Sequence, residues 1–285
     1  MGFLSFGGRR NAGGGSGFRG GRMVIALVIV AISLISYYGK SVYNPVTEEN
    51  QRVDLTVDQE IALGLQAAPE MAQQFGGESQ DTEAKARVER IGRRIIERTK
   101  AGETNYQYHF VLLADGETIN AFALPGGPVF MTEGLLSRLE TDGEIAGVLG
   151  HEIGHVVARH GAEHLAKAKL TQGLAGEATV ATYDPENPYS RQSAAAAMAV
   201  AQLVTLRFGR EDELEADRLG VRFTSEAGYD PRSMVRVMEV LAEASRGGKP
   251  PEFFRTHPNP DRRVERITLA IRERYPNGVP DDLIK

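Results

Sequence analysis

The feature that most constrains this chain is the stretch Gly147–Ala158, because it carries the pattern His-Glu-x-x-His from His151 to His155. Side chains four residues apart on a helix lie on the same face, one turn apart, so the two imidazoles can bind one tetrahedral metal ion. Glu152 stands beside that face and can reach a water molecule at the metal. The pattern therefore predicts a zinc site on a helix.

The residues around this motif predict where its helix begins and which side faces the core. Thr141-Asp-Gly-Glu144 is a capping box with Thr141 at the N-cap. The core-facing stripe consists of Ile145, Val148, Leu149, Ile153 and Val156. The small residues on the histidine side, which we expect to leave room for a substrate, are Gly147, Gly154 and Ala158. Two ordinary core histidines are the alternative, but few chance matches would fall on a capped amphipathic helix.

Composition limits the class of protein. A chain of 285 residues with 41% apolar residues can bury a sizeable core in one large or two small domains. The absence of cysteine excludes disulfides, thiolate metal sites and cysteine nucleophiles. The net charge is −5, and residues 1–46 hold five basic residues and no acidic one, so the remainder carries −10. An acidic body argues against nucleic acid as a partner.

The N-terminal segment predicts a membrane anchor. Residues 1–22 are rich in glycine and arginine and should be disordered. Residues 23–38 contain no charge, and as a helix they would be about 24 Å long, close to the thickness of a hydrocarbon core of ~30 Å. We therefore expect a transmembrane helix at 23–39 and a linker at 40–53. Four arginines before the span, against one lysine just after it, place the N-terminus in the cytoplasm.

Two other interpretations of the apolar segment are less favourable. A cleaved signal peptide would need an Ala-x-Ala-like site, and the run ends instead in Ser-Tyr-Tyr-Gly-Lys. A buried core helix would be expected to have a polar face, and none is present. An uncleaved anchor leaves the rest of the chain in the periplasm or outside the cell.

The body of the chain predicts an α+β fold, mostly helical with a small antiparallel sheet. Helices are expected from Thr56 and over 82–99, and a strand is expected over 106–113, where His109 is not a predicted ligand. Strands at 119–124 and 128–132 flank a Pro-Gly-Gly turn and should form a hairpin. This hairpin either has no role in binding, or its edge forms backbone hydrogen bonds with an extended peptide through Asn120, Ala121, Phe122 and Ala123.

The third metal ligand should come from outside the motif. If the motif helix continues, His160 and His164 are turned away from the metal and cannot reach it. The acidic run 211–220 offers Glu213 and Asp217 on one helical face, as a ligand and a supporting carboxylate. Periodicity alone does not choose between Glu211, Glu213 and Glu215, and such a run can also be a solvated helix face.

Two segments are candidates for covering or assisting the site. Residues 171–193 should form a loop, followed by a helix from about Ser193, and this loop could act as a lid. His257 lies in a proline-rich loop between helices expected to begin at Pro231 and to run through Val264. It could donate to an oxyanion, block the metal, or cap the last helix.

An ordered set of motifs resembles a known family. The set consists of Glu60-Ile-Ala-Leu-Gly64, Asn120-Ala-Phe-Ala-Leu-Pro-Gly-Gly127, Gly134-Leu-Leu136, His151-Glu-Ile-Gly-His155, Glu213-Leu-Glu-Ala-Asp217 and Thr256-His-Pro258. It resembles the zinc endopeptidases of peptidase family M48, which include CAAX prenyl endopeptidases, HtpX-type membrane proteases and bacterial periplasmic quality-control proteases. The match covers about residues 54–275. One departure is Gly209, where the family commonly has serine before the arginine.

The resemblance implies a zincin-like metallopeptidase domain at 54–275, followed by a tail at 276–285. It implies one zinc ion per chain, bound by His151, His155 and Glu213. Glu152 would be the general base and Asp217 a supporting residue. The strand at 119–124 would be the substrate edge.

The expected protein is therefore a zinc endopeptidase in the bacterial inner membrane, with one span and a periplasmic or external catalytic domain. Its partners would be polypeptide substrates, namely misfolded or unassembled envelope proteins. A membrane-tethered chaperone or adaptor that mainly binds client proteins is the alternative, although a pure binder does not need Glu152. A zinc hydrolase of cell-wall amides is a third possibility, and a single anchor cannot build the intramembrane chamber that prenylated substrates need.

Overall fold

The computed structural model describes most of the domain. The described residues are 28, 31, 34–35, 37–39, 41–174, 197–203, 205–246, 250–258 and 262–285. The expected arm at 1–22, most of the expected anchor at 23–39 and most of the expected lid at 171–193 lie outside them. Within the described residues, no helix has both the length and the apolar character needed to cross a membrane.

A three-stranded sheet lies at the centre of the domain. Its order is β3 (His109–Leu113), β5 (Pro128–Thr132) and β4 (Ala121–Ala123). The expected hairpin is confirmed, because β4 pairs antiparallel to β5. The expectation of an entirely antiparallel sheet is wrong, since β3 pairs parallel to β5. The turn that contains Gly126 and Gly127 folds β5 back between the other two strands, so β5 runs in the direction of β3 and is buried along its whole length.

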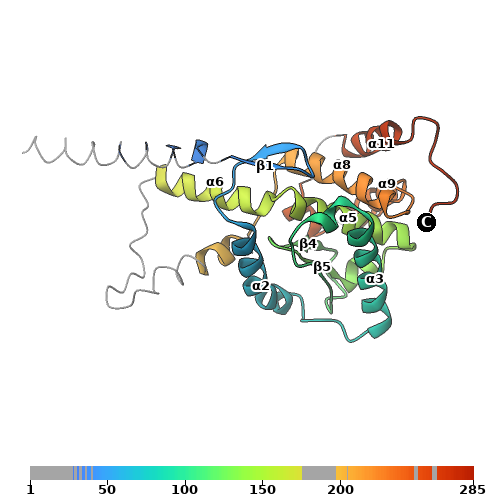
Figure 1. Ribbon diagram of the computed structural model, residues 1–285. Coiled ribbons are helices and arrows are strands. Elements are labelled where there is room, and N and C mark those ends of the chain that lie inside the picture. Colours follow the sequence, from blue (N-terminus) through green and yellow to red (C-terminus); the bar gives the residue numbers. More distant parts are fainter. Residues whose placement is uncertain are drawn as a thin grey trace, which may run out of the picture.

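Helices surround this sheet (Figure 1). Their bounds are α2 Val57–Gln74, α3 Thr82–Arg98, α4 Glu133–Leu136, α5 Asp142–Val157, α6 His160–Leu174, α8 Arg210–Glu226, α9 Ser233–Ser245, α10 Phe253–Thr256 and α11 Arg263–Arg274, with a 3₁₀ turn at Lys100–Glu103. The expected N-caps of α2 and α5 are confirmed, because Thr56 and Thr141 each accept a hydrogen bond within a complete capping box. Gly209 is the N-cap of α8 and has no capping side chain, but its backbone N–H donates to the Asp212 carboxylate at 2.7 Å.

The central helix is α5, which contacts α3, α8, α9 and β4. Every residue from Gly143 to Val157 is buried. The space beside its small residues is filled by neighbouring helices: a Cβ at Gly147 would lie 3.0 Å from the Met234 side chain of α9, and one at Gly154 would lie 3.0 Å from the carbonyl oxygen of Ala216 in α8. The expectation that these residues leave room for a substrate is therefore wrong. They let helices pack closely against the motif.

The end of α5 differs from the continuous helix considered above. Arg159 adopts a left-handed conformation with φ 60°, and α6 begins anew at His160. The last carbonyl groups of α5 are bound by a hairpin formed by β1 (Val42–Asn44) and β2 (Glu49–Gln51). The Asn44 amide donates to the Val157 carbonyl at 2.7 Å, and the Gln51 amide donates to that of Ala158. These bonds satisfy carbonyls that a helix end leaves without partners.

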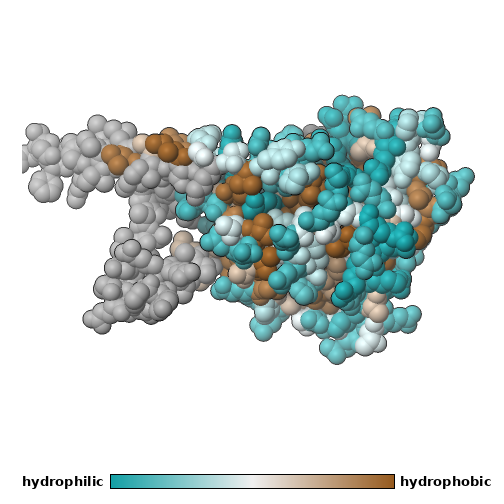
Figure 2. All heavy atoms as spheres, viewed as in Figure 1, coloured by the Kyte–Doolittle hydropathy of each residue, from teal (hydrophilic) through white to brown (hydrophobic). Residues whose placement is uncertain are grey.

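The two ends of the described chain have different surroundings. At the C-terminal end, Ile284 exchanges backbone hydrogen bonds with Gly228 and Asp230, at 3.0 and 2.8 Å. At the N-terminal end, the described residues include exposed apolar side chains, namely Val28, Leu34 and Ile35. Figure 2 shows brown atoms on the extension at the left, whereas much of the right-hand part of the domain is hydrophilic on this face.

Candidate metal centre

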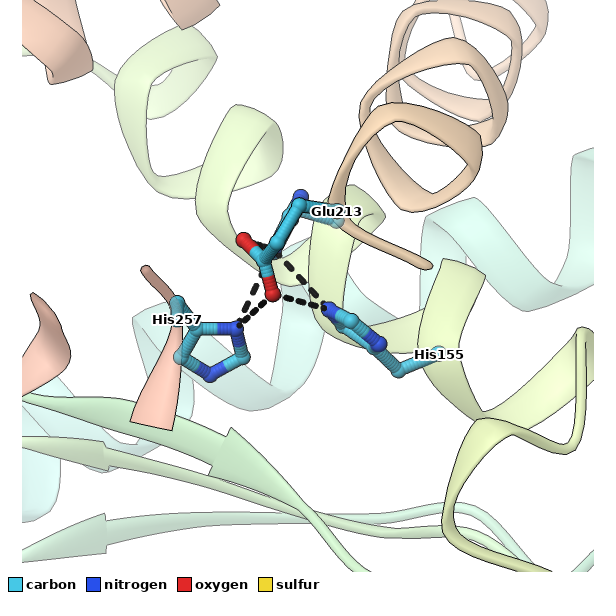
Figure 3. Close-up of side chains that lie close together, drawn as sticks. His155, Glu213 and His257 are labelled. Atoms are coloured by element: carbon cyan, nitrogen blue, oxygen red, sulfur yellow. Dashed lines mark hydrogen bonds and ion pairs between the residues drawn. The ribbon is translucent and has the colours of Figure 1, made fainter. Parts of the chain in front are cut away.

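Four side chains converge between α5, α8 and the residue that follows α10. They are His151, His155, Glu213 and His257, all buried, each offering a ligand atom within 4.8 Å of the others. Figure 3 shows that the last three point toward one another. The motif predicted His151 and His155 as ligands, the family resemblance added Glu213, and His257 was a candidate for assisting or blocking the site. The structure brings all four together. It also distinguishes Glu213 from its neighbours, because Glu211 and Glu215 are not members of the group.

The spacing of these atoms fits a tetrahedral zinc ion. The Nε2 atoms of His151 and His155 lie 3.1 Å apart; Glu213 Oε2 lies 3.7 Å from the first, and Glu213 Oε1 lies 3.5 Å from the second. His257 Nδ1 lies 3.5 Å from His151 Nε2 and 3.0 Å from Glu213 Oε1. Four ligands at zinc distances of ~2.0–2.1 Å are about 3.3 Å apart in a tetrahedron. The residues therefore fit the ion that the motif predicts.

The charge of Glu213 also suits a ligand. Burial acts to raise the pKa of its carboxyl group, but the nearby positive charge of His257 and the hydrogen bond from His257 hold that pKa well below its ordinary value. The group is therefore an ionised carboxylate in the folded protein. An ionised carboxylate and two neutral imidazoles make a ligand set typical of catalytic zinc.

Asp217, predicted as a supporting carboxylate, contacts His151. Its Oδ1 lies 2.9 Å from His151 Nδ1, on the side of the ring away from the centre. Burial acts to raise the pKa of Asp217, but the charge of Arg263 and the bond to His151 lower it below its ordinary value. An ionised Asp217 keeps the proton of His151 on Nδ1, so Nε2 is free to bind a metal.

His155 has a different partner, which the sequence analysis missed. Its Nδ1 lies 2.8 Å from His160 Nδ1, and His160 Nε2 lies 3.2 Å from Glu215 Oε2. The expectation for His160 assumed a continuous helix, and that assumption is wrong, because the chain breaks at Arg159 and α6 begins anew at His160. His160 therefore contacts His155, although it is not a member of the metal-ligand group. The left-handed residue at the break is an arginine, and the nearest glycine, Gly161, comes two residues later, inside α6. His164 is turned away as expected and pairs with Asp212 at 2.6 Å.

Glu152 has the environment of a general base that awaits a ligand. It is completely buried, and neither of its carboxylate oxygens has a hydrogen-bond partner among the described residues. Burial raises the pKa of its carboxyl group. His257 Nε2, at 3.6 Å, is its nearest cation, and it too is without a hydrogen bond in the described structure. Unsatisfied buried polar atoms gathered at one point indicate a site for an ion or water.

Arg263 is a second residue that the sequence analysis missed. It is 3% exposed, its guanidinium binds Asp217 at 2.7 and 2.9 Å, and its Nη1 lies 3.0 Å from Glu213 Oε2. Burial acts to lower its pKa, but the carboxylates of Asp217 and Glu213 raise that pKa. The adjacent Arg262 is exposed, and periodicity does not separate the two at the start of α11.

The segment 250–258 covers the site. His257 is completely buried, and the backbone N–H of Phe253 donates to the carbonyl of Ile119, beside the strand predicted to bind substrate, at 3.1 Å. Asn120, Ala121 and Phe122 are buried, and Ala123 is partly buried. The cavity that adjoins His151 and Asp217 has a volume of only about 20 Å³. That cavity can hold about one water molecule.

Comparisons with known proteins agree with this geometry. The family model described as Peptidase family M48 matches residues 82–271. The chain is 32% identical over 216 residues to the Beta-barrel assembly-enhancing protease of Yersinia pestis. The aligned region covers 74% of this chain and 43% of that protein. It is 29% identical over 249 residues to Mitochondrial metalloendopeptidase OMA1 of Schizosaccharomyces pombe, which covers 86% of this chain and 71% of that protein.

The aligned regions cover 43% of the Yersinia pestis protein and 46% of a relative from Vibrio cholerae, so the chain spans about half the length of these bacterial relatives. The family match itself includes the motif helix, the acidic helix and most of α11. The resemblance inferred from the motifs is thus confirmed. The chain belongs to peptidase family M48, the family of zinc metallopeptidases that those motifs indicated.

Proposed function

We propose that this protein is a zinc-dependent endopeptidase whose ligands are His151, His155 and Glu213 and whose general base is Glu152. The observation that carries the proposal is the buried, unsatisfied carboxylate of Glu152 beside a tetrahedral set of ligand atoms. When bound, zinc would polarise the scissile carbonyl and lower the pKa of water. Glu152 would accept the proton of the attacking water and pass it to the departing amine. Asp217 would hold His151 in its metal-binding orientation.

We also propose that His257 blocks the site at rest. A catalytic zinc needs an open fourth position, and His257 Nδ1 lies close enough to the other ligand atoms to fill that position, 3.0 Å from Glu213 Oε1 and 3.5 Å from His151 Nε2. Of the roles considered for His257, occlusion agrees better with these distances than donation to an oxyanion. The segment 250–258 must then withdraw before a substrate can bind.

His257→Ala distinguishes these two roles. If His257 blocks the metal, the variant should hydrolyse a polypeptide faster than the wild type at saturating zinc. If His257 stabilises an oxyanion, the variant should be slower, because loss of one such donor typically lowers kcat by about 10²–10³. The rate should be measured with a fluorescent casein over a range of substrate concentrations, so that kcat and KM are separated.

The substrate is proposed to be an extended polypeptide that pairs with residues Asn120 to Ala123. β4 is an edge strand of the sheet, and it contacts α5, which carries the motif. Withdrawal of Phe253 from Ile119 would expose backbone groups next to the metal ligands. Main-chain hydrogen bonds at an edge accept many sequences, which suits an enzyme that removes misfolded proteins.

The proposed setting is the bacterial envelope, with residues 23–39 as a single membrane anchor and residues 54–275 as the peptidase domain outside the cytoplasm. Support comes from the exposed apolar residues of the N-terminal segment (Figure 2). The relatives named beta-barrel assembly-enhancing proteases suggest substrates among misfolded or unassembled envelope proteins. Neither the arm at 1–22 nor the tail at 276–285 has a part in the proposed chemistry.

The decisive experiment compares the full-length, zinc-loaded chain in mild detergent with Glu152→Gln and with a matched surface variant, Glu140→Gln. Wild type and Glu140→Gln should degrade casein, and Glu152→Gln should be slower by roughly 10²–10⁴-fold while it still binds zinc. If all three bind zinc and none cleaves casein, even in the His257→Ala background, the endopeptidase proposal fails. The tethered chaperone or adaptor would then be the better interpretation.

A further inference from the structure

We propose that His160 is a positioning residue for the zinc ligand His155, and that Glu215 anchors His160 in that role. The inference rests on the proposed zinc site, in which His155 binds the metal through Nε2. It assigns a function to two residues that supply no ligand atom to the centre. The contacts that carry it are the His155–His160 distance of 2.8 Å and the His160–Glu215 distance of 3.2 Å.

The two histidine ligands differ in what holds their outer nitrogen. His151 Nδ1 contacts the carboxylate of Asp217 directly, at 2.9 Å. His155 Nδ1 contacts another imidazole, and the carboxylate, that of Glu215, stands one step further out. Metal-binding histidines nearly always donate their second N–H to a carboxylate, a carbonyl or water, which fixes the tautomer and the orientation of the ring. In this protein one of the two ligands achieves this through an intermediate histidine.

The order of hydrogen bonds determines where each proton must be. A carboxylate accepts but does not donate, so the contact with Glu215 places an N–H of His160 at Nε2, and a His155 that binds metal through Nε2 carries its own proton on Nδ1. His160 Nδ1 is then an acceptor, and the proton between the two rings belongs to His155 Nδ1. With its proton on Nδ1, His155 has a free lone pair on Nε2. That lone pair lies on the side of the metal centre, 3.1 Å from His151 Nε2.

The break between α5 and α6 makes this contact possible. On a continuous helix His160 would lie on the opposite face from the metal, but the left-handed Arg159 redirects it. Arg159 is held there by the buried carboxylate of Glu60, whose Oε1 lies 2.8 Å from its Nε. His160 is 2% exposed, and the ring of Phe208 stacks on His155 at 3.9 Å between centroids. Water is thereby kept from competing for the hydrogen bond between the two histidines.

A purely structural role for His160 would be to tie α6 to α8. The chain contains a matched pair that does only this, because His164, one turn later on α6, binds Asp212, near the start of α8, at 2.6 Å. His164 has no hydrogen bond to a metal ligand among the described residues. Substitutions at the two histidines therefore distinguish a role in linking α6 to α8 from a role in orienting the zinc ligand.

The test measures the zinc dissociation constant of the full-length chain by competition with a chromophoric chelator. His160→Leu removes the acceptor and should weaken zinc binding by roughly 10–100-fold. His160→Asn keeps an oxygen that can accept from His155 Nδ1 and should recover most of that loss. His164→Leu should bind zinc as the wild type does. The visible spectrum of the cobalt-substituted protein should change in His160→Leu and resemble wild type in the other two variants.

Each outcome bears on the proposal. Wild-type affinity in His160→Leu, or equal weakening in His160→Leu and His160→Asn, would overturn it. Equal weakening in His160→Leu and His164→Leu would assign His160 to the tie between helices. Thermal unfolding of the zinc-free variants identifies any that do not fold. If His160→Leu does not fold, the zinc affinity of His160→Asn relative to wild type decides whether the proposal stands. If His155→Ala binds zinc as tightly as wild type, the zinc site itself is wrong, which is a distinct failure.

Discussion

The spacing between α5 and α8 should set the affinity of the site for zinc, and Gly154→Ala tests this. Gly154 lies on α5 between the two histidine ligands, and a Cβ there would lie 3.0 Å from the carbonyl oxygen of Ala216 and 3.2 Å from its Cα. Contacts this short require the neighbour to give by a few tenths of an ångström. Because these atoms are backbone, α8 must move as a unit, and Glu213 moves with it.

The expected size of the effect follows from two opposing contributions. Alanine is favoured over glycine inside a helix by about 1 kcal/mol, and overpacking a well-filled interface costs about 1–3 kcal/mol. The free energy of unfolding of the zinc-free protein should therefore fall by no more than about 2 kcal/mol. Zinc ligand distances tolerate errors of about 0.2 Å, which the shift of α8 exceeds. A strain of 1–2 kcal/mol in the bound state corresponds to a zinc dissociation constant that is roughly 5–30-fold higher.

The assay combines chelator competition for zinc with urea unfolding of the zinc-free protein. Gly116→Ala is the control, because no heavy atom lies within 4 Å of the added Cβ at that position. The reasoning is refuted if Gly154→Ala folds and binds zinc with wild-type affinity. That result would mean that α8 adjusts locally and that the spacing of the helices does not govern the site.

Three further predictions concern stability. Gly126→Ala should lower the free energy of unfolding by more than about 2 kcal/mol, because Gly126 has φ +81° and the added Cβ would lie 2.3 Å from the Cα of Ile61; an unchanged urea midpoint would contradict this. Arg159→Met should lower the free energy of unfolding by about 3–5 kcal/mol, because the buried Glu60 loses its positively charged partner. Adding Glu60→Met should recover most of that loss in the same assay. Zinc at about 100 times its dissociation constant should stabilise the protein by about 2.7 kcal/mol, and a chelator should reverse the accompanying rise in Tm. A Tm that changes with neither zinc nor chelator would mean that the ion does not bind the folded state.

The parts of the site that the sequence predicted are those that depend on helical periodicity. The spacing within α5 places His151 and His155 on one face, and the spacing within α8 places Glu213 and Asp217 on another. Each pair can be recognised because it lies within a single helix, where a difference of four residues has a fixed geometrical meaning. The cap at Thr141 could be predicted for the same reason, since a capping box is local.

The parts that the sequence did not predict depend on contacts between elements. His160 was placed on the wrong face because the left-handed Arg159 is held by Glu60, 99 residues earlier in the sequence. Arg263 reaches Asp217 from a helix that begins 46 residues later, and its sequence surroundings resemble those of the exposed Arg262. The parallel pairing of β3 with β5 likewise depends on a contact between strands that are not adjacent in the sequence, because β5 inserts between β3 and β4. In each case the deciding partner is distant in sequence, so local patterns carry no signal for it.

The charges buried around the site should make zinc binding depend on pH. The buried cluster contains three carboxylates, those of Glu152, Glu213 and Asp217, and one guanidinium, that of Arg263. If all four are ionised and His257 is neutral, the cluster has a net charge of −2. Burying uncompensated charge costs several kcal/mol per ion. Without zinc, protons supply part of the deficit: burial raises the pKa of Glu152, and the carboxylates of Glu213 and Glu152 raise that of His257 although burial acts to lower it.

A zinc ion supplies the two missing positive charges, so its binding should displace those protons. Groups whose pKa is raised hold their protons to higher pH, and the zinc affinity should therefore rise with pH through the range in which Glu152 and His257 titrate. Calorimetric zinc titrations in buffers with different ionisation enthalpies measure the number of protons released. Fewer protons should be released in His257→Ala than in the wild type. Zinc binding without proton release would show that the zinc-free cluster is not neutralised in this way.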